Sequence, residues 1–398
     1  MKIGKERIHN LPMNDVTSLG AYAQQLEIEA QAKGIVLPPA VRLQIGEPSF
    51  RTPEHIRQAA IEAVAHEPMI YGPAGGWPWL RELLAAKIQR VNGYSIQPSN
   101  TAIAVGGTGA VLVAMLATLN PGDEVLIPDP CWPMYFMQLA TCGVIGVPYP
   151  LDPYNEWLPE TSALEKLVTP RTRMVIMNTP GNPTGAIFPA QSVHEMLEFA
   201  RRHDLYLLSD ECYDEIVFEG THVSPATMLS SDELESGRFI GIYTFSKSYA
   251  MTGWRIGYLV SSTAMIETII NVLNASYTNM ATMIQRAAAA ALTGPQDCVA
   301  TMRDTYKRRR DLAVTLLKDY GRYIYTPHGA FYALIDVRGK RVSRGRQFAL
   351  DLLHERNVAV APGSGFGSVS QDYVRISLAA SEEEVERGVR EICEFADR

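Results

Sequence analysis

Lys247 stands where the chain could provide a nucleophilic amine. It closes the segment Thr244-Phe245-Ser246-Lys247, which ends the apolar run 239–244, and Arg255 follows eight residues later. Most lysines lie on solvated surfaces, but a lysine at the end of a buried strand loses hydration, which favours the neutral, nucleophilic amine. A nearby guanidinium would favour the neutral amine further and could neutralise a phosphate group.

Asp210 and Tyr213 follow another apolar run, residues 205–209, in the segment Ser209-Asp210-Glu211-Cys212-Tyr213. A carboxylate at the end of a buried strand costs free energy unless it is paired. Its partner could be the cationic nitrogen of a heterocyclic ligand, or simply a buried arginine or lysine.

A glycine-rich turn, Gly106-Gly107-Thr108-Gly109, follows the apolar run 102–106 and precedes an apolar helical stretch. Glycines allow a ligand to approach the backbone closely, and the free N–H groups of a helix N-terminus favour a phosphate. No Gly-Lys-Ser/Thr follows, which excludes a P-loop. A tight turn without a ligand explains the same pattern, so this motif alone indicates little.

Two further strand ends carry Trp132, in Pro130-Cys131-Trp132-Pro133, and Asn182, in the loop 178–185. A lone tryptophan is most often a core residue, but it can also stack on a flat ring. The two Pro and two Gly of the loop predict a nearly rigid backbone. The loop is therefore either a plain turn or a support that holds Asn182 as a fixed hydrogen-bond donor.

Each of these features has an ordinary structural explanation, but all of them occur at successive strand ends. Together they predict a ligand with a flat ring, a basic ring nitrogen, a ring oxygen, a phosphate and an electrophilic carbon. Pyridoxal 5′-phosphate has every one of these features. The residues assigned to them are, in the same order, Trp132; Asp210; Asn182 and Tyr213; Gly107, Thr108, Thr244 and Arg255; and Lys247.

Seven short apolar runs must position these residues, at 102–106, 124–128, 143–148, 173–178, 205–209, 239–244 and 256–260. Continuous apolar runs are typical of strands buried on both faces, and helical stretches such as 109–119, 160–169 and 189–203 lie between them. This alternation predicts an α/β fold with a mostly parallel seven-stranded sheet covered by helices, and a functional site at the carboxyl ends of its strands.

The pattern changes after residue 290. We expect a charged helix at 295–320, followed by shorter strands at 322–326, 331–337 and 373–377 and helices at 344–356 and 382–395. The prediction is a large ligand-binding domain of residues 51–290 and a small α+β domain of residues 291–398, with the N-terminal segment 1–50 packed against the small domain.

The composition limits the possible partners. Of the 398 residues, 46% are hydrophobic and 20% are charged, as in an ordinary globular protein, and the net charge of -7 argues against nucleic acid. The one dense basic run, 307–310, is expected on the solvated face of a helix. Five widely spaced cysteines without a Cys/His cluster predict reduced thiols and no metal site. No signal-peptide core and no apolar run approaching ~20 residues is present, so we expect a cytoplasmic protein without a membrane partner.

Over nearly the whole chain these motifs resemble those of the class I/II aminotransferases, the fold-type I pyridoxal-phosphate enzymes that include aspartate aminotransferase. Besides the segments above, the resemblance rests on Gly46-Glu47-Pro48; Tyr71; Leu80-Arg81-Glu82; Asn120-Pro121-Gly122-Asp123-Glu124-Val125; Asn182-Pro183-Thr184-Gly185; Gly253-Trp254-Arg255-Ile256-Gly257; Pro362-Gly363; and Arg375 in Tyr373-Val374-Arg375-Ile376-Ser377.

The resemblance implies catalytic roles for three residues. Lys247 would hold the cofactor as a Schiff base and carry the proton between the substrate carbon and the cofactor. Asp210 would keep the ring nitrogen protonated, so that the ring accepts electrons. Tyr213 would hold the ring oxygen together with Asn182, while Trp132 would stack on the ring.

The resemblance also implies substrate contacts and a second subunit. Arg375 would clamp the substrate α-carboxylate, with Trp132 and Asn182 nearby, and Gly46 would leave room beside that carboxylate. Tyr71 would reach the phosphate in the neighbouring subunit, which implies a homodimer with shared active sites. An amino acid would give its amino group to the cofactor and a 2-oxo acid would then take it, in a ping-pong reaction.

Substrate and reaction type stay open. Some aspartate aminotransferases have an arginine for the distal carboxylate where this chain has Asn274, and we expect Ile45, Phe50, Trp132 and Tyr135 to line a pocket for an apolar or aromatic amino acid. A C–S lyase or an aminocyclopropane-carboxylate-synthase-like enzyme would share the catalytic lysine. An effector-sensing regulator would need a DNA-binding module, for which the segment before Gly46 is too short. The complete set of cofactor residues argues against a relative without catalysis.

Overall fold

The computed structural model describes residue 11 and residues 15–340 and 344–398. The helices are α2 Asp15–Ala32, α3 Glu54–His66, α4 Pro78–Lys87, α5 Gly106–Thr118, α6 Met134–Cys142, α7 Thr161–Glu165, α8 Ala190–Arg202, α9 Ser231–Ser236, α10 Thr263–Tyr277, α11 Thr282–Thr293, α12 Asp297–Asp319, α13 Gly345–Arg356 and α14 Glu382–Ala396. The strands are β1 Val41–Arg42, β2 Thr101–Ala104, β3 Glu124–Asp129, β4 Ile145–Asp152, β5 Leu158–Pro159, β6 Thr172–Asn178, β7 Tyr206–Asp210, β8 Phe239–Thr244, β9 Gly257–Val260, β10 Tyr332–Asp336, β11 Val358–Ala359, β12 Ala361–Pro362 and β13 Tyr373–Ser377.

Within the described ranges the large sheet has eight strands, in the order β2-β9-β8-β7-β6-β3-β4-β5. Neighbouring strands from β8 to β4 are parallel, whereas β9 is antiparallel to β2 and β8, and β5 is antiparallel to β4. All seven expected strands are present, so the predicted α/β fold with a mostly parallel sheet is confirmed. The additional strand, β5, has two residues and is too short to show a hydrophobic period in the sequence.

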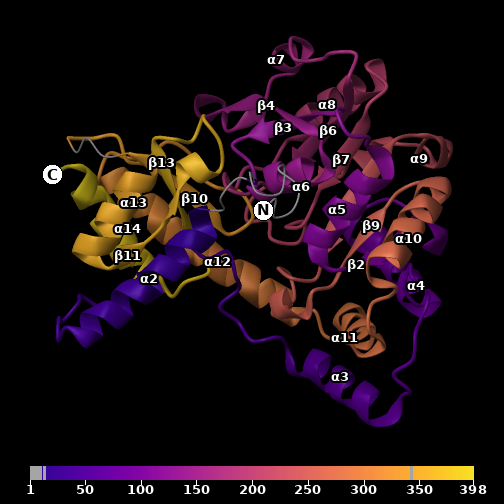
Figure 1. Cartoon of the computed structure of the whole chain (residues 1–398), viewed down its shortest axis with the longest axis horizontal. Helices are drawn as coiled ribbons and strands as arrows, with labels where there is room; N and C mark the ends of the chain where they lie inside the picture. Colours follow the sequence, from indigo (N-terminus) through magenta and orange to yellow (C-terminus); the bar gives the residue numbers. More distant parts are fainter. Residues whose placement is uncertain (1–10, 12–14, 341–343) are drawn as a thin grey trace, which may run out of the picture.

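Both faces of the large sheet are buried, because successive side chains of a strand point to opposite sides. On β3, Val125 and Ile127 pack in one core with α5, α6 and α10, whereas Leu126 packs on the other face with α7 and α8. Figure 1 shows α5 and α10 next to β2 and β9 on one side of the molecule. Burial on both faces explains why the strand segments are continuously apolar instead of alternating.

The C-terminal elements form most of another core. Strands β10, β13 and β12 make an antiparallel sheet in that order, and β1 pairs in parallel with β11. Leu19 of α2 and Leu43 after β1 are buried in the same core as α12, α13 and α14, and Figure 1 shows α2 beside these helices. This packing supports the proposed division into a large domain, residues 51–290, and a small domain, residues 291–398. The described part of the N-terminal segment 1–50 packs with the small domain, and residues 1–10 and 12–14 lie outside the described ranges.

The strand expected at 322–326 is absent, and that prediction is wrong. This stretch has no partner strand, and the chain beyond it crosses to the loop after β6. There the N–H groups of His328 and Gly329 donate to the Gly185 carbonyl oxygen at 2.9 and 3.0 Å. The helix expected at 160–169 is also shorter, because α7 ends at Glu165.

The expectation of a solvated basic face at 307–310 is wrong for two of its residues. Arg309 and Arg310 are buried, and the Arg310 guanidinium donates to the Pro327 carbonyl oxygen at 2.6 Å and pairs with Glu219. Four consecutive residues span more than one helical turn, so they cannot share one face of α12.

Candidate active site

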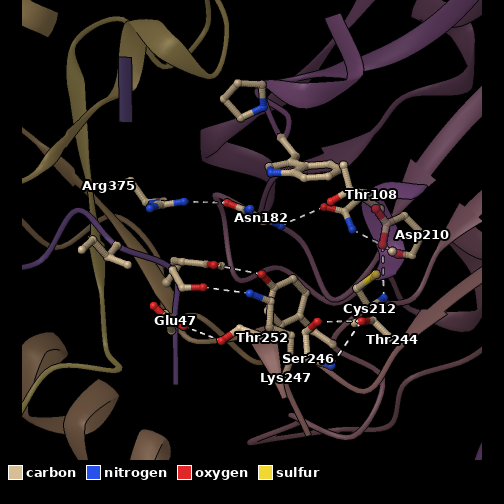
Figure 2. A pocket seen from close by; sticks show the side chains of 18 of the residues that line it. Glu47, Thr108, Asn182, Asp210, Cys212, Thr244, Ser246, Lys247, Thr252 and Arg375 are labelled. Atoms are coloured by element: carbon tan, nitrogen blue, oxygen red, sulfur yellow. Dashed lines mark hydrogen bonds between the residues drawn. The ribbon is translucent and has the colours of Figure 1, made fainter. Parts of the chain in front are cut away.

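A cavity of about 360 Å³ lies where β6, β7 and β8 end, between the large sheet and the C-terminal part of the chain (Figure 2). Because parallel strands end at the same edge of a sheet, the polar residues that follow them converge there. The cavity is lined by Ile45, Gly46, Glu47, Gly107, Thr108, Trp132, Pro133, Asn178, Asn182, Asp210, Cys212, Tyr213, Thr244, Ser246, Lys247, Thr252, Arg255, Tyr332, Phe366 and Arg375. Every residue predicted to hold the cofactor or the substrate α-carboxylate, except Tyr71, is among them.

One end of the cavity is suited to a phosphate. The first turn of α5, with Gly107 and Thr108, brings free N–H groups and the positive end of a helix dipole to the cavity wall. Arg255 lies so close that a Cβ on Gly106 would be 2.7 Å from its Nη2 atom. The hydroxyl of Thr244 donates to that of Ser246 at 2.9 Å, which leaves the Ser246 hydroxyl as a neutral donor. Backbone N–H groups, a guanidinium and hydroxyls together form a site for a dianion.

Asp210 is a buried carboxylate without a cationic side chain beside it in the part of the chain that the structure describes. Its Oδ1 accepts the N–H of Cys212 at 3.2 Å, and its Oδ2 accepts the hydroxyl of Tyr135. Burial raises the pKa of this carboxyl, and the hydrogen bonds from Tyr135 and Cys212 oppose that rise. Since the arginine or lysine considered as a structural partner is not found, the carboxylate is free to pair with a cationic ring nitrogen.

Lys247 lies between the two ends of the cavity, as Figure 2 shows. Its Nζ donates to the Gly46 carbonyl oxygen at 2.8 Å and lies 5.8 Å from the centre of the Tyr213 ring and 5.6 Å from that of Phe331. No described carboxylate is within ion-pair distance of this amine. The amine is thus held by a neutral acceptor and two aromatic rings, which leaves it available for reaction with a carbonyl carbon.

Arg375 provides a buried cation at the opposite end of the cavity. It is 3% exposed, and it donates to the side-chain oxygen of Asn182 at 3.1 Å and to the Gln44 carbonyl oxygen at 2.6 Å. Its guanidinium contacts the rings of Tyr332 and Phe366, at 4.3 and 4.8 Å from their centres. Burial lowers the pKa of Arg375, and among the described residues its Nε has no acceptor. A desolvated guanidinium with an unused donor is suited to bind a carboxylate.

Asn182 is oriented by its hydrogen bond with Arg375. Its side-chain oxygen accepts from Arg375 and its backbone N–H donates to the side chain of Asn178 at 2.8 Å. Only the side-chain nitrogen of Asn182 can therefore act as the donor that the sequence predicted.

The side chain of Tyr332 occupies the space beside Gly46, where the sequence predicted room beside the substrate carboxylate. A Cβ on Gly46 would lie 2.1 Å from the hydroxyl oxygen of Tyr332, so this glycine makes room for a protein side chain. The same Tyr332 hydroxyl is 2.9 Å from the hydroxyl of Tyr213. The sequence did not indicate Tyr332 or Phe366 as site residues, because one begins a strand of the C-terminal core and the other lies in a short turn before β13.

Four other residues considered for the site lie outside the cavity lining. Tyr71 is 85% exposed, and Asn274 is exposed on α10. The prediction that Phe50 and Tyr135 line the pocket is wrong: Phe50 packs edge-on against Tyr306, with ring centres 5.8 Å apart, and Tyr135 is buried among the residues of the large-sheet core.

The fold and the cavity define a class of protein: an α/β protein with an end suited to a phosphate, a buried carboxylate, an unpaired lysine amine and a buried guanidinium in one cavity. The chain belongs to the family Aminotransferase class I and II, whose sequence profile matches residues 38–392. It is therefore an aminotransferase, as the sequence motifs predicted. Enzymes of this family use pyridoxal phosphate, and their substrates are amino acids and 2-oxo acids.

Similar proteins include aminotransferases named for different substrates. The chain is 34% identical, over 389 residues, to an aspartate/prephenate aminotransferase of Thermus thermophilus, covering 97% of each chain. It is 38% identical, over 352 residues, to aromatic-amino-acid aminotransferase 2 of Thermococcus litoralis, covering 88% of this chain and 90% of the relative. A structure of aspartate aminotransferase from Thermus thermophilus with maleate superimposes with a TM-score of 0.90 at 33% identity, covering 99% of this chain and all of that one.

Two further structural findings concern membrane-spanning helices and metal ligands. In the ranges that the structure covers, no helix is long and apolar enough to cross a membrane. In the same ranges, no three His, Cys, Asp or Glu side chains gather as metal ligands would.

Proposed function

We propose that this chain binds pyridoxal 5′-phosphate and transfers an amino group between an L-amino acid and a 2-oxo acid by a ping-pong mechanism. The observation that supports this most strongly is that Lys247, Asp210 and Arg375 line one cavity without pairing with one another. When bound, pyridoxal phosphate supplies an aldehyde that condenses with amines and a ring that takes up electrons released at the substrate α-carbon.

The residues of the cavity fit this cofactor. The first turn of α5 with Thr244 and Arg255 would hold the phosphate, and Asp210 would keep a proton on the ring nitrogen. Trp132 would lie against the face of the ring, while Tyr213 and Asn182 would donate to its oxygen. Lys247 would hold the cofactor carbon and then move a proton at the substrate α-carbon. Arg375 would bind the α-carboxylate of both substrates.

A lyase or synthase of the same fold would use the same lysine, so the reaction type needs its own experiment. The protein is incubated with an amino acid labelled at nitrogen, with and without 2-oxoglutarate. Transfer of the label to glutamate, dependent on the oxo acid, supports the proposal. Release of the label as ammonia in the absence of an oxo acid would instead indicate a lyase.

We propose an apolar or aromatic amino acid as the amino donor. Ile45, Trp132, Pro133 and Phe366 give the cavity apolar walls, and each cation among its described lining residues already has a proposed role. Relatives named for aspartate favour a dicarboxylic donor as the second candidate. A kcat/KM for phenylalanine at least about tenfold above that for aspartate would support the first candidate, since pocket complementarity discriminates on this scale. A preference for aspartate would support the second.

We also propose a homodimer with shared active sites. Tyr71 is exposed together with the neighbouring Ile70, and Ile61 and Val64 of α3 are 58% and 56% exposed. We call these four residues the α3 surface. Exposed apolar residues are typical of protein interfaces, and these four lie close together in the sequence. The cytoplasmic location stays a prediction.

A further inference from the structure

Tyr135 connects two residues that line the cofactor cavity, although it does not line the cavity itself. It lies in the first turn of α6 and is fully buried. Its hydroxyl donates to Oδ2 of Asp210, and its ring meets that of Trp132 edge-on, with centres 5.4 Å apart and planes at 89°. Tyr135 therefore contacts both the carboxylate and the indole that would face the cofactor ring.

Two described residues hold the carboxylate of Asp210, namely Cys212, through its backbone N–H and its thiol, and Tyr135. The backbone N–H of Cys212 lies 3.2 Å from Oδ1, and the Tyr135 hydroxyl donates to Oδ2. Asn178 donates to the backbone carbonyl oxygen of Asp210 at 3.0 Å, and this hydrogen bond does not hold the Asp210 carboxylate. Loss of the Tyr135 hydroxyl would leave Oδ2 of Asp210 without this donor and the carboxylate held by Cys212 alone, so it would be freer to turn away from the cavity.

The proton of this hydrogen bond belongs to Tyr135. Burial and the nearby charge of Asp210 raise the pKa of Tyr135 well above its ordinary value. The phenol therefore stays neutral and donates, which favours the ionised form of Asp210. An ionised carboxylate is the form that can hold a proton on a ring nitrogen.

We propose that Tyr135 is a positioning residue that fixes the Asp210 carboxylate for the ring nitrogen of the cofactor. The proposal rests on the proposed function, since it requires pyridoxal phosphate in the cavity. Under this proposal Tyr135, a core residue, contributes to the affinity of the protein for pyridoxal phosphate through the ring nitrogen of the cofactor.

The test compares two ligands of the cofactor-free protein: pyridoxal phosphate and an analogue in which a C–H group replaces the ring nitrogen. Tyr135→Phe should weaken pyridoxal phosphate binding roughly tenfold or more, the effect of losing a hydrogen bond to a charged group. It should leave the affinity for the analogue unchanged, because the analogue has no proton for Asp210 to hold. Tyr135→His, which keeps an N–H donor, should restore part of the preference for pyridoxal phosphate.

Tyr149→Phe is the matched control. Tyr149 is also fully buried, and its hydroxyl donates to the Ile176 carbonyl oxygen at 2.8 Å, away from Asp210. This variant should bind both ligands like the wild type. Equal weakening of both ligands by Tyr135→Phe would show a merely structural role, for instance in supporting Trp132, and unchanged binding of both would also overturn the proposal. Failure of the wild type to bind pyridoxal phosphate would instead contradict the proposed function.

Discussion

Arg375 on β13 donates from its Nη1 to the side-chain oxygen of Asn182 at 3.1 Å. This hydrogen bond crosses from the small C-terminal sheet to the loop after β6 of the large sheet. Asn182 is in turn tied to Asn178, which donates to the backbone oxygen of Asp210 at 3.0 Å. Arg375 and Asp210 come from different cores, and this series of hydrogen bonds connects them.

Arg375→Ala should raise KM for the amino acid and for the oxo acid alike, because both carry the carboxylate that the guanidinium would bind. Loss of a hydrogen bond to a charged group costs roughly 1.5–3 kcal/mol, so kcat/KM should fall by about 10- to 100-fold for each substrate. Arg338→Ala is the control, since Arg338 pairs with Asp336 on the same small sheet and is 44% exposed. Steady-state kinetics check this, and an effect on one substrate alone would rule out a shared clamp.

Gly46→Ala should destabilise the protein, because its Cβ would lie 2.1 Å from the Tyr332 hydroxyl oxygen. Overpacking of this kind costs about 1–3 kcal/mol. It should also weaken cofactor binding, since the Gly46 carbonyl oxygen accepts from Lys247. Adding Tyr332→Phe should recover part of the stability by removing the closest atom.

Gly253→Ala is the control for this substitution, because nothing lies within 4 Å of a Cβ at that position. Thermal unfolding of the cofactor-free proteins measures the effect. A Gly46→Ala variant as stable as the wild type would show that Tyr332 moves aside at no cost.

Asp210 should make the cofactor-free protein less stable as the pH rises. Burial raises the pKa of this carboxyl above its ordinary value of 3.8, so the folded protein binds the proton more tightly than the unfolded chain does. The contribution of Asp210 to the free energy of unfolding is therefore largest below 3.8, falls as the pH rises through the raised pKa, and is then constant.

Asp210→Asn stays neutral and should not show this decline. Urea unfolding of both cofactor-free proteins, from about pH 4 to about pH 7, should show the stability of the wild type falling relative to that of the variant. A difference that does not change with pH would mean that Asp210 is not titrating in a buried environment.

Ile61→Glu should disrupt the proposed homodimer, because it places a charge in the exposed apolar α3 surface. Its control is Ile28→Glu, since Ile28 is 61% exposed on α2, comparable to the 58% of Ile61. Light scattering should give a dimer for the wild type and for Ile28→Glu, and a monomer with weaker cofactor binding for Ile61→Glu. A wild type that is monomeric at assay concentrations would defeat the prediction of shared active sites.

The sequence was most informative where a polar residue ends a buried strand. Asp210 and Lys247 could be predicted because a charged side chain at that point costs free energy unless it has a function or a partner. Gly107 and Arg255 followed from the chemistry of a phosphate and from spacing. Chain connectivity then brings these residues together, because parallel strands end at one edge of the sheet.

The contacts of Tyr332 and Tyr135 could not be predicted in this way. Tyr332 begins a strand of the small sheet, and in the sequence it is an ordinary apolar core position. The side-chain direction of Tyr135 depends on the packing of α6 against the sheet, so it was expected in the pocket and instead supports Asp210 from the core. The Tyr332 contact depends on the relative placement of two cores, and the Tyr135 contact depends on how a helix packs on its own sheet; no local pattern encodes either.

The most direct test is the visible absorption spectrum of the purified protein with pyridoxal phosphate, recorded before and after adding an amino acid and then 2-oxoglutarate. We expect a yellow band that a suitable amino acid bleaches and the oxo acid restores. The band should be absent in Lys247→Ala, whose far-ultraviolet circular dichroism should match the wild type. A stable band that never cycles would contradict amino transfer, and the absence of any band in the wild type would contradict binding of the cofactor to Lys247.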